Sequence, residues 1–129
     1  MMTRDQIRNI IDKMGISSRI DEDGDINFIL EADDDFRYNV DIWLIVPPDG
    51  KRLIFFSNAN GYVPNGDLLV LANRSNDRLN YPTAAVRGNE IRFEYCIFIS
   101  EDVSEEFIIN NIRSIVSGIW NGYRSLEKE

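Results

Sequence analysis

Three tight-turn signals divide much of the chain into segments in which apolar and polar residues alternate. The signals are Asp23-Gly24, the run from Pro47 to Gly50, and Gly88-Asn89. Pairs of this kind favour hairpins because their residues adopt the backbone angles that a tight turn requires. The alternation between the turns has the period of two that is typical of strands with one buried face. Hairpins join antiparallel neighbours, so the pattern predicts an antiparallel sheet.

Segments with helical periodicity stand before, between and after the predicted strands. Apolar side chains recur at helical spacing in residues 3–14, 67–79 and 104–126. The predicted strands cover about residues 17–21, 26–31, 36–46, 51–57, 81–87 and 90–100. The order α-β-β-β(-β)-α-β-β-α predicts an α+β fold in which helices pack on an antiparallel sheet. We expect residues 1–129 to form a single domain, because this length is that of one ordinary domain.

Local signals mark the ends of the first two predicted helices. Thr3 and Gln6 have the spacing of a capping box, in which each side chain bonds a backbone N–H of the other residue. Asp67 is placed to cap the second helix. Pro82 should end that helix, because Tyr81 before a proline is pushed out of helical geometry.

The charge and the residue types argue against two classes of function. The net charge is −8 and the pI is near 4.5, and the 14 Lys and Arg residues are scattered along the chain. Binding of phosphates depends on clustered cations, so we expect no nucleic-acid partner. The chain has no histidine, which removes the commonest general base and metal ligand. We therefore expect a protein without enzymatic activity.

The single cysteine and the lack of long apolar runs predict the environment of the protein. Cys96 has no second cysteine or histidine as a partner, and we interpret it as a structural, unreactive thiol. One free cysteine indicates a reducing cytoplasmic location. The longest apolar run is far shorter than the ~20 residues of a membrane helix, and no apolar signal-peptide core follows the N-terminus. We expect no membrane contact and no cofactor.

Acidic residues gather at both ends of one predicted strand, at 21–25 and at 33–35. An EF-hand loop needs oxygen ligands at positions 1, 3 and 5 and a glycine at position 6. Counting from Asp21 places Gly24 at position 4 instead. Solvated carboxylates are common in turns, so the sequence predicts no metal site.

Several aromatic residues fall on or near the predicted strands and the last helix. Trp43, Phe55, Phe56 and Tyr62 could line an apolar groove for a peptide or a small ligand, although core packing under helices also explains them. Trp120 falls toward the edge of the apolar stripe of the last helix, from where it could reach the surface of a partner.

Two asparagines, Asn73 and Asn76, stand near the end of the second predicted helix. At 100° per residue, Asn76 faces the packed side of the helix and Asn73 lies at its boundary. A buried amide without partners costs about 1–3 kcal/mol for each unpaired group. We therefore expect Asn76 to bond backbone groups of the sheet as a structural anchor, and the alternative is a ligand contact.

Three segments of the chain together resemble the YbjN family. They are the run Leu71 to Asn76, the hairpin Tyr81 to Ser100 and the segment Val103 to Glu106, within a similarity that covers about residues 20–126. The resemblance implies a fold similar to that of type III secretion chaperones. It also implies a small, acidic, often dimeric protein of a family assigned to bacterial sensory transduction regulators, which binds other polypeptides and has no catalytic residue. Residues 81–85 are smaller and less charged than this family leads us to expect.

Two functions are consistent with these observations. The first is a non-enzymatic module, chaperone- or adaptor-like, that captures a polypeptide segment on an exposed part of the sheet, and that forms a homodimer as the family resemblance implies. The alternative is a small-ligand sensor whose pocket lies under the second helix and involves Asn73, Asn76 and Tyr62.

Overall fold

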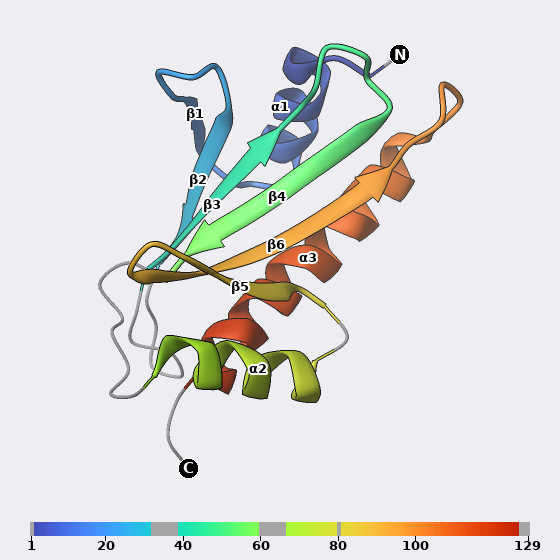
Figure 1. The fold of residues 1–129 in the computed structure, drawn as a ribbon. Helices are drawn as coiled ribbons and strands as arrows, with labels where there is room; N and C mark the ends of the chain where they lie inside the picture. Colours follow the sequence, from blue (N-terminus) through green and yellow to red (C-terminus); the bar gives the residue numbers. More distant parts are fainter. Residues whose placement is uncertain (1, 32–38, 60–66, 80, 127–129) are drawn as a thin grey trace.

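The residues that the structure describes form three helices and one six-stranded sheet (Figure 1). The computed structural model describes residues 2–31, 39–59, 67–79 and 81–126. The helices are α1 (Arg4–Lys13), α2 (Leu68–Arg78) and α3 (Glu105–Ser125). The strands are β1 (Ser18–Ile20), β2 (Ile26–Leu30), β3 (Val40–Ile45), β4 (Arg52–Asn58), β5 (Thr83–Arg87) and β6 (Glu90–Phe98).

The strand order across the sheet is β1-β2-β3-β4-β6-β5, and every neighbouring pair is antiparallel. The first four strands follow one another as a meander. The chain then passes through α2, forms the edge strand β5 and returns by a hairpin that places β6 beside β4. The element order is α-β-β-β-β-α-β-β-α, so the predicted α+β class with an antiparallel sheet is confirmed.

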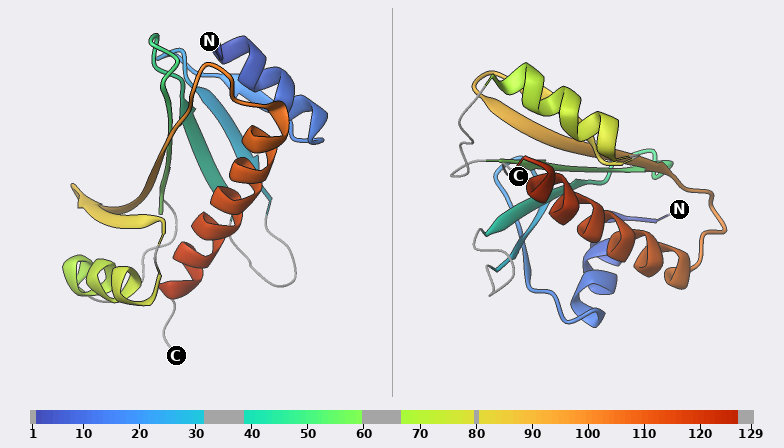
Figure 2. Two further views of the ribbon diagram at one scale, coloured as in Figure 1. Left: turned by 90° about the vertical axis from the view of Figure 1, so that its right-hand side faces the viewer. Right: turned by 90° about the horizontal axis from the view of Figure 1, so that it is seen from below.

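Helices α1 and α3 lie on the same face of the sheet, as the left view of Figure 2 shows. Alternate residues of the strands point to this face, and the core lies between them and the two helices. The largest fully buried side chains are Ile7, Ile11, Ile26, Phe28, Ile42, Leu44, Leu53, Phe55, Ile91, Phe93 and Tyr123. The period of two in the sequence thus predicts which side of each strand the core occupies.

Helix α3 supplies a long apolar stripe to this core. The buried isoleucines of the stripe are Ile108, Ile112, Ile115 and Ile119. Full burial of each contributes about 1.5–3 kcal/mol, whereas an exposed ion pair such as Lys13–Glu105, which joins α1 to α3, contributes at most about 1 kcal/mol. Apolar packing therefore decides where α3 lies. Neither α3 nor the other described helices are both long and apolar enough to cross a membrane.

Helix α2 lies beside β5 and the C-terminal end of α3 (Figures 1 and 2). Its residue Ser75 is buried, and the hydroxyl oxygens of Ser75 and Ser125 are 2.7 Å apart. Arg74 donates from Nη2 to the carbonyl oxygens of Ser125 and Leu126, at 3.4 and 3.3 Å. Carbonyls at a helix C-terminus lack helical partners and favour a cation, so Arg74 joins α2 to the end of α3.

The local signals at the helix ends are confirmed in most cases. Thr3 and Gln6 form the predicted capping box, with N–H to side-chain distances of 2.8 and 3.3 Å. Asp67 caps α2, which ends at Arg78 before the Tyr81-Pro82 step. The largest differences in strand length are in the predicted strands 81–87 and 90–100, since β5 begins at Thr83 and β6 ends at Phe98, whereas β1 and β2 differ from their predicted ranges by at most one residue at each end. The first residues of the predicted strand 36–46 lie outside the described residues.

Two glycines of α3 allow other side chains to approach the helix, and their replacement should have different effects. A Cβ at Gly122 would lie 2.9 Å from the ring of Phe93, which is fully buried and cannot move away. Overpacking costs about 1–3 kcal/mol, against about 1 kcal/mol that alanine gains in helix propensity. We expect Gly122→Ala to lower the free energy of unfolding by up to about 2 kcal/mol in urea denaturation.

Gly118→Ala is the matched control. A Cβ at Gly118 would lie 2.8 Å from the ring of Tyr81, which is 41% exposed and can shift toward solvent. We expect this variant to be neutral or slightly more stable, because the gain in helix propensity remains. Equal losses of stability in the two variants would contradict the explanation.

Candidate functional site

The face of the sheet opposite α1 and α3 carries no described helix in front of β2, β3, β4 and β6, and we call it the open face (Figures 1 and 2). Strand alternation and register decide which side chains point to it. They are Arg19, Asn27, Ile29, Asp41, Trp43, Ile45, Arg52, Ile54, Phe56, Asn58, Glu90, Arg92, Glu94, Cys96 and Phe98.

A row of side chains crosses the open face from β1 to β4. The register places Asn27 between Arg19 on β1 and Trp43 on β3. Asn27 is buried; its Oδ1 accepts from Arg19 Nε at 2.9 Å, and its Nδ2 donates to Ile42 O at 3.1 Å. Trp43 stands next to Phe56, and the two rings stack with their centroids 5.2 Å apart and their planes 7° from parallel.

Arg92 on β6 completes this row. Its guanidinium carbon lies 4.5 Å from the centre of the Phe56 ring, and its Nε donates to Asn58 Oδ1 at 2.9 Å. A cation over an aromatic ring contributes about 0.5–1 kcal/mol at an exposed site, and an aromatic pair about 0.5–1.5 kcal/mol. Phe56 is therefore held between Trp43 and Arg92, and the row stiffens the middle of the open face.

A shallow hollow of about 390 Å³ lies next to this row. It is lined by Ile54, Thr83, Glu94, Tyr95 and Cys96. Glu94 forms an ion pair with Arg87 at 3.2 Å along its rim. Cys96 is exposed here, although we interpreted it from the sequence as a structural thiol within an apolar run. The difference arises because Cys96 points to the face of the sheet that α1 and α3 do not cover.

Side chains occupy backbone groups at both edges of the sheet. On β1, Arg8 donates from Nη2 to Ser18 O at 3.0 Å. On β5, Asn76 donates from Nδ2 to Ala84 O at 2.9 Å and accepts from Ala84 N at 2.7 Å. An unpaired strand edge is a template for pairing with another chain, and these contacts oppose such pairing at Ser18 and Ala84. The arrangement favours contacts with a partner through the open face over contacts through these edge positions.

A buried pair of hydroxyls connects α3 to the sheet. Tyr123 donates to Asn58 O at 2.6 Å, and its oxygen is 2.8 Å from Ser57 Oγ. Ser57 has one hydroxyl proton, which it donates either to the Tyr123 oxygen or to Asp41 O. Burial raises the pKa of Tyr123 to about 12, because the phenolate would lose its hydration, and the hydrogen bond with Ser57 acts in the opposite direction. Tyr123 thus stays protonated at neutral pH as a structural contact.

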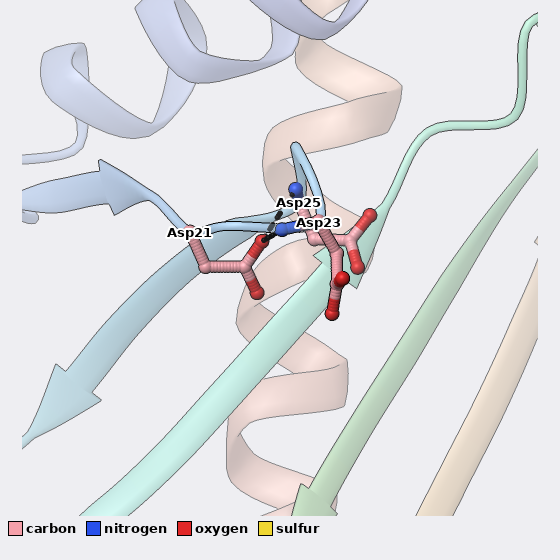
Figure 3. A group of neighbouring side chains, drawn as sticks. All are labelled: Asp21, Asp23 and Asp25. Atoms are coloured by element: carbon pink, nitrogen blue, oxygen red, sulfur yellow. Dashed lines mark hydrogen bonds between the residues drawn. The ribbon is translucent and has the colours of Figure 1, made fainter.

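Three aspartates, Asp21, Asp23 and Asp25, meet in the turn between β1 and β2 (Figure 3), and one carboxylate oxygen from each lies within 4.8 Å of the others. Asp21 Oδ1 accepts from the backbone N–H groups of Asp23 and Asp25, both at 2.9 Å. Arg4 donates to Gly24 O at 3.1 Å and connects the turn to α1. Burial raises the pKa of Asp25, and the charges of Asp21 and Asp23 raise it further. These hydrogen bonds account for the cluster as a turn.

The structure does not bring the predicted site residues together. Trp43 is half-buried in the middle of the open face. Trp120 is half-buried on α3, which covers the opposite face. Asn73 and Asn76 lie on α2, beside the edge strand. Tyr62 lies outside the described residues.

Two further expectations about side-chain direction are corrected. Phe55 does not share a groove with Phe56, because it is fully buried on the core face of β4. Asn76 makes the predicted bonds to backbone groups of the sheet, which confirms its anchoring contact. It is nevertheless exposed, as Asn73 is, and does not face the buried stripe. The reason is that α2 lies beside β5, so the boundary of the helix reaches the strand.

Residues that the sequence analysis missed build most of the row on the open face. Asn27 and Arg92 occupy polar positions of alternating strands, which by pattern alone are ordinary solvent-facing residues. Their importance depends on the register, which places each of them beside an aromatic ring or a second polar side chain. A local signal exists only for Asn27, which is an asparagine between the apolar residues Ile26 and Phe28.

Comparison with models of known protein families finds no matching family, and no curated protein matches the chain. The resemblance to the YbjN family and to type III secretion chaperones therefore stays a prediction.

Removal of the Asn76 amide should destabilise the protein, whereas removal of the Asn73 amide should not. Asn76→Ala leaves the backbone N–H and C=O of Ala84 without this partner, which costs about 1–2 kcal/mol. Asn73→Ala undergoes the same change in helix propensity but loses no hydrogen bond to the described residues. Urea denaturation of both variants isolates the effect, and equal free energies of unfolding would contradict an anchoring role.

The raised pKa of Tyr123 predicts a loss of stability at high pH. Its pKa is about 12 in the folded protein and 10.0 in the unfolded chain. The stabilisation is therefore complete below pH 10 and is lost as the pH rises from 10 to 12, by about 3 kcal/mol in total. We expect thermal unfolding of Tyr123→Phe to depend less steeply on pH over this range. A dependence as steep as in the unmodified protein would contradict the assignment.

Proposed function

We propose that this protein is a non-enzymatic polypeptide-binding module, chaperone- or adaptor-like, that holds a partner segment on the open face. The observation that carries the proposal is an apolar surface without a described helix over it. Trp43, Ile45, Ile54 and Phe56 are half-buried there, and Phe98 is 78% exposed. Contiguous exposed apolar surface of this kind marks interaction sites in soluble proteins.

The polar side chains on the open face favour a polypeptide over a nucleic acid. Arginines and carboxylates are interspersed with the apolar residues, which suits a segment of mixed composition. The ring of Phe56 is held between Trp43 and Arg92, so its faces are not a platform for stacked bases. The net charge of −8 also opposes a phosphate backbone.

A second copy of the chain is one such polypeptide, and a homodimer is part of the proposal. The edge contacts at Ser18 and Ala84 favour association through a face. A cytoplasmic location agrees with the single unpaired cysteine. Light scattering at high micromolar concentration measures whether the protein associates with itself.

The contacts of α2 do not favour the alternative of a ligand pocket beneath that helix. Its inner residues Leu71, Ala72 and Ser75 are buried, and Ser75 meets Ser125 directly. The Asn76 amide is engaged with Ala84. The protein-binding proposal therefore rests on the better-supported surface.

Single-tryptophan variants test the proposal, because the two tryptophans lie on opposite sides of the sheet. Trp120→Phe leaves Trp43 as a reporter of the open face, and Trp43→Phe leaves Trp120 as a reporter of α3. A peptide array first selects binding sequences at moderate salt. We expect these peptides to shift the emission of the Trp120→Phe protein and to leave that of the Trp43→Phe protein unchanged.

The pair Ile54→Lys and Val70→Lys provides the control. Ile54 lies on the open face, whereas Val70 is 63% exposed on α2. We expect Ile54→Lys to weaken binding at least tenfold and Val70→Lys to have little effect, with circular dichroism confirming that both variants fold. The proposal fails if the array returns no specific peptide, or if bound peptides leave the Trp43 emission unchanged.

A further inference from the structure

Two exposed phenylalanines flank a hollow at the end of the open face. Phe98, the last residue of β6, is 78% exposed, and Phe107, in the first turns of α3, is 43% exposed. Both line a hollow of about 400 Å³. Its other lining residues are Ile99, Ser100, Asp102, Val103 and Ser104.

The exposure of the two rings follows from the positions of their neighbours. Ile97 and Ile99 are buried on the core face, so strand alternation turns Phe98 outward. Ile108 is buried in the core, which leaves Phe107 at the side of the helix. No described aromatic residue stacks on either ring, and neither Phe98 nor Phe107 belongs to the buried core.

Hydrogen bonds hold the connection between the two rings. Ile99 N donates to Lys51 O at 2.9 Å, and Val103 N donates to Ser100 O at 3.2 Å. Ser104 caps α3 by accepting from Phe107 N at 3.0 Å. The wall of the hollow is therefore preorganised, which lowers the entropic cost of binding a side chain there.

The rim along this connection is acidic. Glu101, Asp102 and Glu106 are exposed and form no ion pair with the described residues, whereas Glu105 is paired with Lys13. The positive end of the α3 dipole, about half an elementary charge, does not offset three carboxylates. On the other side of Phe98, its cross-strand neighbour Arg52 on β4 and the preceding Lys51 carry positive charges.

We propose that this hollow receives a large apolar side chain of a partner segment that carries lysine or arginine next to that side chain. The inference rests on the proposed polypeptide-binding function and adds the chemistry of the partner. Apolar burial between Phe98 and Phe107 supplies affinity. The carboxylates of the β6–α3 connection select a cation, which binds away from Lys51 and Arg52.

The hollow and the centre of the open face can be occupied by the same segment. Phe98 on β6 is paired with Arg52 on β4, and Trp43 on β3 is paired with Phe56 on β4. Trp43 therefore lies two strands away from Phe98 and four residues further along the strands. Strand spacings place the two positions about 16 Å apart. An extended segment covers this distance with about five residues.

Three synthetic peptides of twelve residues test the proposal. The first has a central phenylalanine flanked by four lysines in a serine-glycine background; the second replaces the lysines by glutamates, and the third replaces the phenylalanine by alanine. We expect the lysine-phenylalanine peptide to bind at least tenfold more tightly than the others, measured by fluorescence anisotropy of the labelled peptides.

Variants of the protein test the same site. Phe98→Ala and Phe107→Ala should each weaken the binding of the lysine-phenylalanine peptide about tenfold. The double variant Asp102→Asn, Glu106→Gln should weaken it and flatten its dependence on salt.

Leu69→Ala is the matched control, because Leu69 is 63% exposed on α2, away from the hollow. All the replaced side chains are exposed, and circular dichroism checks that the variants fold. Equal affinity for the lysine and glutamate peptides, or phenylalanine variants that behave like Leu69→Ala, would overturn this inference. If array peptides then still shift the Trp43 emission, the proposed polypeptide-binding function stands without it. Absence of binding by all three peptides also overturns the inference. The peptide array described above tests the proposed polypeptide-binding function separately.

Discussion

The burial of one face of the sheet by α1 and α3 is the constraint on which the rest of the structure depends. The isoleucines of α3 alone contribute several kcal/mol through burial. Their stripe meets the core face of the sheet, where Gly122 brings the helix close to the ring of Phe93. The Tyr123 hydroxyl, bonded to Asn58 O, connects the same helix to the sheet by a polar contact. With both helices on this side, none of the described helices covers the central strands on the second face of the sheet.

The open face is stabilised by side chains that lie across the strands. Asn27 is buried between Arg19 and Trp43 with its amide satisfied, and Arg92 packs on Phe56. These contacts cover part of the apolar surface and stiffen it, but they leave Ile54 and the end of β6 accessible. A stiff, partly apolar face loses little entropy when it binds a partner. The same feature thus stabilises the fold and supports the proposed function.

Much of the fold was predictable from the sequence, and little of the candidate site was. Alternation and turn signals predict the strands because each strand has one face in the core, and the capping residues Thr3 and Asp67 act over three residues or fewer. The site depends on contacts between strands. Arg92 reaches the Phe56 ring from another strand, and Asn76 reaches Ala84 because α2 lies beside β5. Neither contact follows from local spacing.

The sequence by itself determined the element order, the antiparallel class of the sheet and the side of each strand that faces the core, because these depend on periodicity and on turn chemistry within a few residues. Only the tertiary structure decided that α1 and α3 cover the same face, that Asn76 closes a strand edge, and that Phe98 and Phe107 flank one hollow. Those outcomes depend on which residues distant in the sequence meet. The packing of the whole core decides which distant residues meet, and no single segment of the sequence contains that information.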